Sequence, residues 1–127
     1  MKTLFLIIIF LFSSNLISQI NCADYKSGRF EYHRPNLKGN YVVERNDSIQ
    51  IEYDLILDTK SVFKINWISD CEYDLTFIKG TKPPLIKNLF VDDFRIKIYS
   101  TEDDNYSFMI IMEENTILDS GRLFRLD

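Results

Sequence analysis

The sequence has few of the residues from which catalytic and metal sites are usually built. Its 127 residues include one histidine, His33, and two cysteines, Cys22 and Cys71. Two thiols and one imidazole fall short of a structural zinc set, and the cysteines are too far apart in the chain for a Cys-x-x-Cys redox pair. Glycine-rich phosphate loops and His-Glu-x-x-His are also absent. We therefore expect no metal, no cofactor and no enzymatic activity. A small hydrolase is the least favoured function, and His33, followed by Arg34 and Pro35, is expected to be a solvated loop residue.

The sequence also has no basic cluster and no apolar run long enough to cross a bilayer. It carries 15 Lys and Arg against 19 Asp and Glu, scattered along the chain. An acidic domain is repelled by a phosphate backbone and by anionic lipid, so we expect neither nucleic-acid nor membrane binding. The longest apolar run, residues 4–12, has nine residues, whereas a spanning helix needs about 20.

That apolar run instead has the layout of a secretory signal peptide. Lys2 precedes it and Ser13-Ser14-Asn15 follows it, which gives a charged start, an apolar middle and a polar exit. We predict that residues 1–19 are a signal peptide cut near Ser18 or Gln19, and that residues 20–127 are one exported domain, periplasmic or secreted. Loss of Lys2 would leave 14 basic and 19 acidic residues, a net charge of −5. The alternatives are a retained N-terminal anchor and lipidation at Cys22, which is disfavoured because residues 19–21 lack the usual small pair.

Both cysteines lie beyond the predicted signal peptide. In an oxidising compartment the simplest outcome is a Cys22–Cys71 disulfide. Such a bond would close a loop of about 50 residues and contribute roughly 4 kcal/mol. That is a large share of the ~5–15 kcal/mol by which a domain of this size is stable.

After residue 19 the pattern is that of short β-strands. Apolar residues alternate in short runs between turn residues, and helical periodicity is almost absent. The connections are too short for crossovers, which predicts an all-β fold: an antiparallel meander of seven or eight strands, closed as a small barrel or folded as a two-layer sandwich. The predicted strands cover residues 29–32, 41–45, 49–57, 62–68, 73–77, 94–99, 106–112 and 118–126. Residues 38–40 and the Pro83-Pro84 segment are expected to interrupt the chain, residues 86–91 are a strand or a short helical turn, and Gly121 marks a bulge or kink.

The alternation predicts which residues share a face of each strand. Residues 49–57 give the clearest signal, and we expect their first set to face the core and their second to face solvent or a cavity. The first set is Ile49, Ile51, Tyr53, Leu55 and Leu57, and the second is Gln50, Glu52, Asp54 and Ile56. The two following strands are expected to bury Phe63, Ile65 and Trp67, and Tyr73, Leu75 and Phe77.

Three stretches carry a recognisable pattern. Residues 22–32 read Cys-x(5)-Gly-x-Phe-x-Tyr, residues 45–52 contain Arg-x(4)-Gln-x-Glu, and residues 67–75 read Trp-x(3)-Cys-x-Tyr-x-Leu. The chain resembles a family of small exported bacterial proteins whose function is not established. The resemblance covers the first half of the mature chain, supports export and the disulfide, and implies no activity. Some relatives carry a topoisomerase label, which the small size and acidic charge of this chain contradict.

The most notable polar set is Arg45, Gln50 and Glu52. If the loop at residues 46–49 closes symmetrically, Arg45 lies opposite Gln50, with Glu52 on the same face one pair further along. The set is then either the polar floor of a ligand site or a structural salt bridge on a hairpin, and the second is favoured.

Aromatic residues suggest a possible apolar pocket. Trp67 and Tyr73, with Phe63 and Phe77, line a small pocket or simply form the core, and core is favoured because a small domain needs its aromatics for burial.

The acidic run 102–105 fits a hairpin turn better than a calcium loop. We therefore expect a non-enzymatic domain that binds a small apolar ligand or a protein; the alternative is a structural, envelope-associated interaction domain without a pocket.

Overall fold

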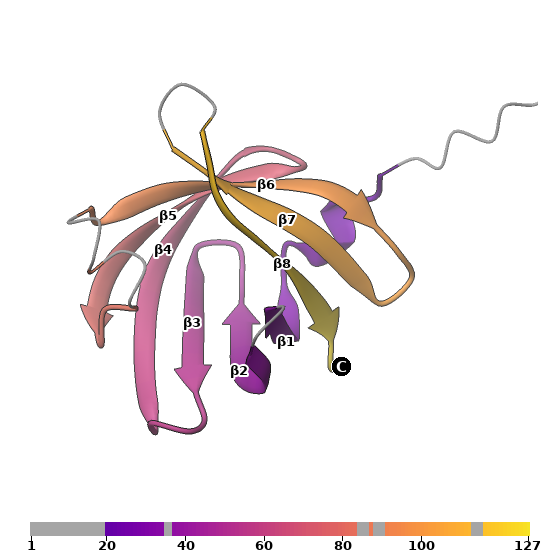
Figure 1. Ribbon diagram of the computed structural model, residues 1–127. Coiled ribbons are helices and arrows are strands. Elements are labelled where there is room, and N and C mark those ends of the chain that lie inside the picture. Colours follow the sequence, from indigo (N-terminus) through magenta and orange to yellow (C-terminus); the bar gives the residue numbers. More distant parts are fainter. Residues whose placement is uncertain (1–19, 35–36, 84–86, 88–90, 113–115) are drawn as a thin grey trace, which may run out of the picture.

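The computed structural model describes residues 20–34, 37–83, 87, 91–112 and 116–127. The predicted signal peptide and most of segment 86–91 lie outside these residues. The fold is all-β: eight antiparallel strands form a closed barrel in which each strand pairs with the next and β8 pairs with β1 (Figure 1). The elements are η1 Ala23–Tyr25, β1 Gly28–Arg34, β2 Leu37–Arg45, β3 Ile49–Asp54, β4 Thr59–Ser69, β5 Glu72–Gly80, β6 Asp93–Thr101, β7 Asn105–Ile111 and β8 Ile117–Arg125.

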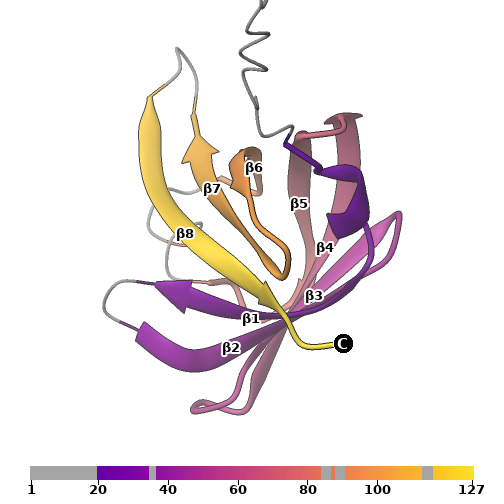
Figure 2. The same ribbon diagram turned by 90° about the vertical axis from the view of Figure 1, so that its right-hand side faces the viewer.

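Closure into a barrel decides between the two predicted architectures. β8 joins β1 through the pairs from Phe30↔Arg125 to His33↔Arg122, so the sheet has no free edge, and the C-terminus lies beside β1 (Figure 2). All eight predicted strands are present, although β2 begins at Leu37 and includes residues 38–40, where an interruption was expected. β3 ends at Asp54, because residues 55–58 form the turn into β4.

The two ends of the barrel differ. One end, called here the η1 end, carries η1 and the turns 46–48, 70–71 and 102–104. The other, called the loop end, carries the turn 55–58 and the β5–β6 connection. Because a meander reverses at every turn, successive turns alternate between these ends.

The core predictions for β4 and β5 are confirmed. Phe63 and Ile65 are buried with Trp67 packed against them, while Lys64 and Asn66 are exposed. On β5, Tyr73 and Leu75 are buried and Phe77 joins the same cluster. The cluster fills the barrel interior, with further members on the strands that close it. These include Phe30, Val43, Ile96, Ile98, Tyr106, Phe108, Ile110 and Leu123.

The predicted core face of residues 49–57 is wrong. Gln50 is buried inside the barrel and Glu52 lines its cavity, whereas Ile51 and its period-two neighbours on β3 lie on the outer wall. Residues 55–57 are not strand but an exposed turn, with Leu55, Ile56 and Leu57 exposed by 60%, 69% and 68%. The reason is visible in the register: Gln50 pairs with Arg45 and with Phe63, both of which point inward.

Gly121 permits close packing and does not form a bulge. The β1–β8 register passes beside it without a shift, and the irregularity in the β7–β8 pair falls between Ile110 and Ile111. A Cβ at Gly121 would lie 2.5 Å from Tyr32 Cε2 and 2.9 Å from Phe108 Cζ. Only glycine lets the two rings approach the β8 backbone from inside the barrel.

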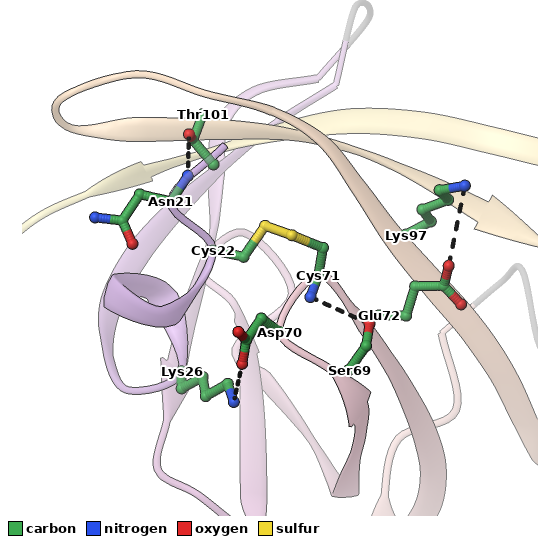
Figure 3. Close-up of a disulfide and its surroundings, with 9 residues drawn as sticks. All are labelled: Asn21, Cys22, Lys26, Ser69, Asp70, Cys71, Glu72, Lys97 and Thr101. Carbon is green, nitrogen blue, oxygen red and sulfur yellow. Dashed lines mark hydrogen bonds and ion pairs between the residues drawn. A yellow bond between two sulfur atoms is a disulfide. The ribbon is translucent and has the colours of Figure 1, made fainter. Parts of the chain in front are cut away.

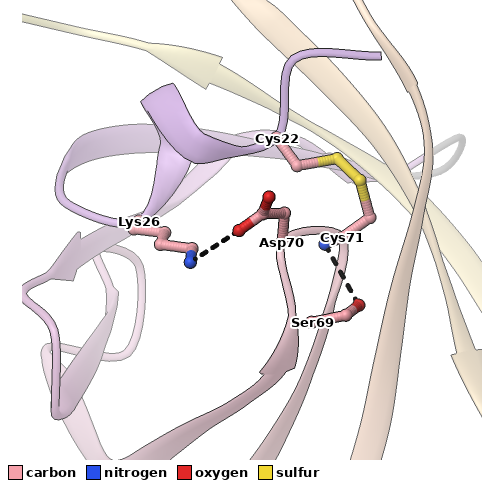
Figure 4. A network of polar contacts seen from close by, with 5 residues as sticks. All are labelled: Cys22, Lys26, Ser69, Asp70 and Cys71. Atoms are coloured by element: carbon pink, nitrogen blue, oxygen red, sulfur yellow. Dashed lines mark hydrogen bonds and ion pairs between the residues drawn. A yellow bond between two sulfur atoms is a disulfide. The ribbon is translucent and has the colours of Figure 1, made fainter.

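The predicted disulfide is present and fastens η1 to the barrel. Cys22, directly before η1, is bonded to Cys71 in the β4–β5 turn, and its side chain is buried (Figure 3). The same junction includes a hydrogen bond from Asn21 N to Thr101 Oγ1 (3.0 Å) and an ion pair between Lys26 and Asp70 (3.0 Å; Figure 4). A sulfur in a disulfide cannot also carry a thioether-linked lipid, so this structure is incompatible with lipidation at Cys22. Among the described residues, no helix is long and apolar enough to span a bilayer.

Candidate functional site

A buried arginine organises the interior near the η1 end. Arg45, the last residue of β2, points inward and is 5% exposed. Its Nε donates to Gln50 Oε1 (2.8 Å) and its Nη1 to the carbonyl oxygen of Tyr25 (2.9 Å). Its Nη2 donates to the hydroxyls of Tyr73 (2.9 Å) and Tyr106 (2.8 Å), which are 3.2 Å apart. Four acceptors on four different elements thus meet one guanidinium.

Aromatic rings and phenols provide most of the environment of this charge. The guanidinium carbon of Arg45 lies 4.8 Å from the ring centroid of Tyr73, 5.3 Å from that of Phe30 and 5.7 Å from that of Tyr106. Burial alone would lower the pKa of Arg45, but the Tyr106 and Tyr73 phenols outweigh it and raise that pKa above its ordinary value. Burial also raises the pKa of Tyr73 well above its ordinary value. Arg45 is therefore charged and Tyr73 neutral at physiological pH.

Gln50 links the arginine to the carboxylate of Glu52. Its oxygen accepts from Arg45, so its amide nitrogen is directed to Glu52 Oε1 at 3.1 Å. The predicted register is confirmed, because Arg45 pairs with Gln50 and Val43 pairs with Glu52. Arg45, Gln50 and Glu52 therefore form one polar chain along the inner wall, from the η1 end toward the middle of the barrel.

A cavity of about 80 Å³ lies beside this polar chain, with Gln50 and Glu52 in its wall. It has room for several water molecules or part of a small ligand. Pro83, in the β5–β6 connection, is part of its lining, so the cavity reaches toward the loop end. The lining residues are Tyr32, Tyr41, Val43, Gln50, Glu52, Tyr73, Leu75, Pro83, Phe94, Ile96, Phe108, Ile110 and Leu123.

The predicted site residues divide into two groups. Gln50, Glu52 and Tyr73 line the cavity, whereas Arg45 is not part of the lining and holds Gln50 and Tyr73 in place through hydrogen bonds. Trp67 is outside the lining and packs against Tyr73, with the two rings tilted by 47° and their centroids 4.6 Å apart. Lys26 Nζ lies over the Trp67 ring, 5.3 Å from the ring centroid.

Phe63 and Phe77 are core residues. Their rings are in edge contact, with centroids 5.8 Å apart, and neither ring is part of the cavity lining. The interpretation of these two aromatics as core is therefore the correct one.

Sequence analysis missed several aromatic residues of the interior. Tyr106 and Phe108 alternate with polar or less buried neighbours on β7, which places them on the inward face. Tyr32 on β1 and Tyr41 on β2 are paired across the two strands, and their ring centroids are 6.1 Å apart. The period-two pattern of residues 106–110 was a usable signal, whereas nothing local marks Tyr25 as the acceptor for an arginine twenty residues away.

His33 is not a loop residue. It belongs to β1 and lies on the outer wall, with Nε2 at 3.3 Å from Glu31 Oε2 and its ring 4.6 Å from that of Phe124. The barrel wall separates it from the polar chain of Arg45, Gln50 and Glu52. Among the described residues, no group of three or more His, Cys, Asp or Glu is arranged to hold a metal ion.

The acidic run 102–105 forms the β6–β7 turn, as expected. Glu102 N donates to the carbonyl oxygen of Asn105 (2.8 Å), which closes the hairpin. The Asn105 amide donates to Glu102 Oε2 (3.2 Å) and Asp104 Oδ1 (2.8 Å). These carboxylates thus stabilise the turn.

No protein-family model, curated protein or solved structure matches this chain.

Proposed function

We propose that this protein is an exported, non-enzymatic binding domain that holds a small, largely apolar ligand inside its barrel. The observation that carries the proposal is the cavity, whose wall is mostly aromatic and aliphatic with a few polar groups. This composition is typical of small-molecule sites, in which apolar walls provide affinity and a few polar groups provide orientation. An eight-stranded barrel is also just wide enough to hold one small ligand.

The rigidity of the polar wall supports the same proposal. Gln50 is fixed by Arg45, and Arg45 is fixed by three further acceptors. A site whose side chains are held by such bonds loses little conformational entropy when a ligand binds. The buried disulfide accords with maturation in an oxidising compartment.

Tryptophan fluorescence offers a direct test, because Trp67 is the only tryptophan and its ring packs against Tyr73 of the cavity wall. Residues 20–127 would be titrated with a neutral naphthylamine dye, and we expect saturable one-to-one binding with a change in Trp67 emission. Val43→Phe, which fills the cavity, should abolish binding, whereas Ile51→Phe on the outer wall should not. Far-UV circular dichroism would establish that both variants fold. Absence of saturable binding across a panel of neutral dyes would contradict the proposal.

Export is tested by the mass of the secreted protein. Mass spectrometry of material from the periplasm or medium should show loss of residues 1–18 or 1–19, two hydrogens fewer for the Cys22–Cys71 bond, and no lipid. Mature protein found in the cytosol would overturn this part of the proposal.

A second candidate function is self-association through the outer wall. Ile49, Ile51 and Tyr53 of β3 form an apolar stripe there, which continues into the exposed turn 55–57. Adjacent exposed apolar residues often mark an interaction surface.

The charges beside this stripe favour a second copy of the chain as the partner. Exposed Lys60 and Lys64 on β4 pair with Tyr53 and Ile49, while Glu44 on β2 pairs with Ile51. A two-fold axis along β3 would place Glu44 of one copy between Lys60 and Lys64 of the other, with the apolar stripes in contact.

Sedimentation across a concentration series tests this second candidate. We expect a monomer–dimer equilibrium that Ile51→Glu abolishes, whereas Ile68→Glu, an exposed position on β4 near the η1 end, leaves it unchanged. A chain that stays monomeric up to millimolar concentration would exclude self-association.

A further inference from the structure

One of the described residues that line the cavity carries a charge. Among the described residues that line the cavity, Glu52 is the only Asp, Glu, Lys, Arg or His. The other lining residues with polar groups are Gln50, Tyr32, Tyr41 and Tyr73. A positively charged ligand would meet an opposite charge at this wall, and an anionic ligand would meet a like charge. Both effects are stronger inside a barrel than in water because the surroundings are less polarisable.

The Glu52 carboxylate is held in a defined place. Gln50 donates to its Oε1, and the orientation of that amide is imposed by Arg45 on the other side. The charge of Arg45 is directed toward Gln50, the Tyr25 carbonyl and two tyrosine hydroxyls, and Arg45 is not part of the cavity lining. A carboxylate has about four lone-pair sites, so a ligand N–H can join the interactions that Glu52 already makes, of which the bond from Gln50 is one.

Aromatic rings surround the same space. Tyr32, Tyr41, Tyr73, Phe94 and Phe108 all line the cavity. Tyr41 is two residues before Val43 on β2, and Val43 pairs with Glu52 on β3. The Tyr41 ring and the Glu52 carboxylate therefore project from neighbouring strands of one wall. Tyr32 lies across from Tyr41, and its ring centroid is 5.5 Å from that of Phe108. The faces of such rings attract cations.

We propose that the cavity selects an organic ammonium ion: a small molecule with an apolar body and a protonated amine that donates to Glu52. This inference rests on the proposed function and narrows its ligand class. The aromatic walls contact the apolar body of the ligand. The Glu52 carboxylate and the faces of the rings bind its cationic end. The same walls accept a neutral molecule of equal shape less tightly and exclude a carboxylate.

A matched ligand series separates these cases. The mature protein would be titrated by calorimetry at pH 7 with 2-phenylethylamine, 2-phenylethanol and phenylacetate, which share a ring and differ in charge. We expect the ammonium form to bind about tenfold or more tightly than the alcohol, since a hydrogen bond to a charged group typically contributes that much. Phenylacetate should show no measurable binding.

Two variants assign the selectivity to Glu52. Glu52→Gln should bring the amine and the alcohol to within about twofold of each other, because the hydrogen-bonding shape is kept and the charge is lost. Glu72→Gln removes a carboxylate from the outer wall of β5, where Glu72 lies beside Lys97, and should leave the preference unchanged. Circular dichroism checks that both variants are folded.

The possible outcomes separate this inference from the proposed function. If the neutral dye binds but the wild-type protein shows no preference for the amine, or if Glu52→Gln keeps the preference, the ammonium inference is wrong and ligand binding remains. If neither the dye nor any member of the series binds, the proposed function itself is wrong.

Discussion

Replacement of Arg45 by methionine is the most informative single perturbation of this barrel. Methionine keeps much of the apolar length of arginine and removes all of its donors. The acceptors affected are the Tyr25 carbonyl, Gln50 Oε1 and the hydroxyls of Tyr73 and Tyr106. We expect Arg45→Met to fold and to be substantially less stable than the wild type.

The size of the loss follows from which acceptors find a substitute. The Tyr73 and Tyr106 hydroxyls are 3.2 Å apart and can bond to each other, so they lose little. The Tyr25 carbonyl and Gln50 Oε1 lose their donor from Arg45, at about 1–3 kcal/mol each. Removal of a buried charge offsets part of this, because a desolvated guanidinium is itself costly. We therefore expect a net loss of about 3 kcal/mol in the free energy of unfolding.

Urea denaturation followed by Trp67 emission and by circular dichroism measures this loss. With a slope of about 1–3 kcal/mol per molar urea, the midpoint should fall by roughly 1–3 M. Arg29→Met is the control, since Arg29 lies on the outer wall beside Glu44 and its loss should change stability by no more than about 0.5 kcal/mol. If Arg45→Met matched this control, the network of Arg45 would not be a source of stability and our reasoning would be refuted.

Three further changes test other parts of the structure. Replacing Cys22 and Cys71 together by alanine should cost about 4 kcal/mol, measured by urea denaturation, and a reducing agent should then have no further effect on the variant. Because the pKa of Tyr73 is raised in the folded state, the stability it provides is complete below the ordinary tyrosine pKa and is lost as pH rises through the folded value. Unfolding midpoints measured from pH 8 to 11 should thus decline above about pH 10, less steeply in Tyr73→Phe, and an equal slope would argue against this assignment. Gly121→Ala should push the Tyr32 ring into the cavity, lower stability by about 1–3 kcal/mol and weaken dye binding, and unchanged dye affinity would show that the cavity is not narrowed there.

Local pattern was enough to predict most of the architecture. Alternation along β4 and β5 identified the buried faces of Phe63 and Tyr73, and short turns implied an antiparallel meander. The Cys22–Cys71 bond followed from counting cysteines in a chain that the sequence predicts to be exported. Barrel closure was not predictable, because period-two strands are equally suited to a sandwich and the β1–β8 contact joins opposite ends of the domain.

The inverted face of β3 shows where pattern reasoning fails. Alternation reveals two faces but not which one is inside, and the more apolar face was assigned to the core. In the barrel, Arg45 is buried and needs an acceptor, so Gln50 and Glu52 face inward and Ile51 faces outward. The polar requirement of one buried cation therefore outweighs the burial of isoleucine on this strand.

Only those contacts of the candidate site that join residues close in sequence were predictable. The Arg45–Gln50 pairing spans a tight turn, so register could be inferred from sequence. The bonds from Arg45 to Tyr73 and Tyr106 join residues 28 and 61 positions apart, which depend on how the barrel closes. The cavity is a product of the same closure.

The Cys22–Cys71 bond anchors η1 so that it covers one end of the barrel. Tyr25 of η1 is buried under Tyr106 with centroids 4.9 Å apart, and its hydroxyl donates to the backbone carbonyl of Glu102 (2.6 Å). If the cavity holds a ligand, as proposed, the ligand would enter and leave on the side that Pro83 lines, toward the loop end. A partner that covered the loop end would slow ligand entry and ligand exit by the same factor. The ligand would then stay bound for longer, while its equilibrium affinity would not change.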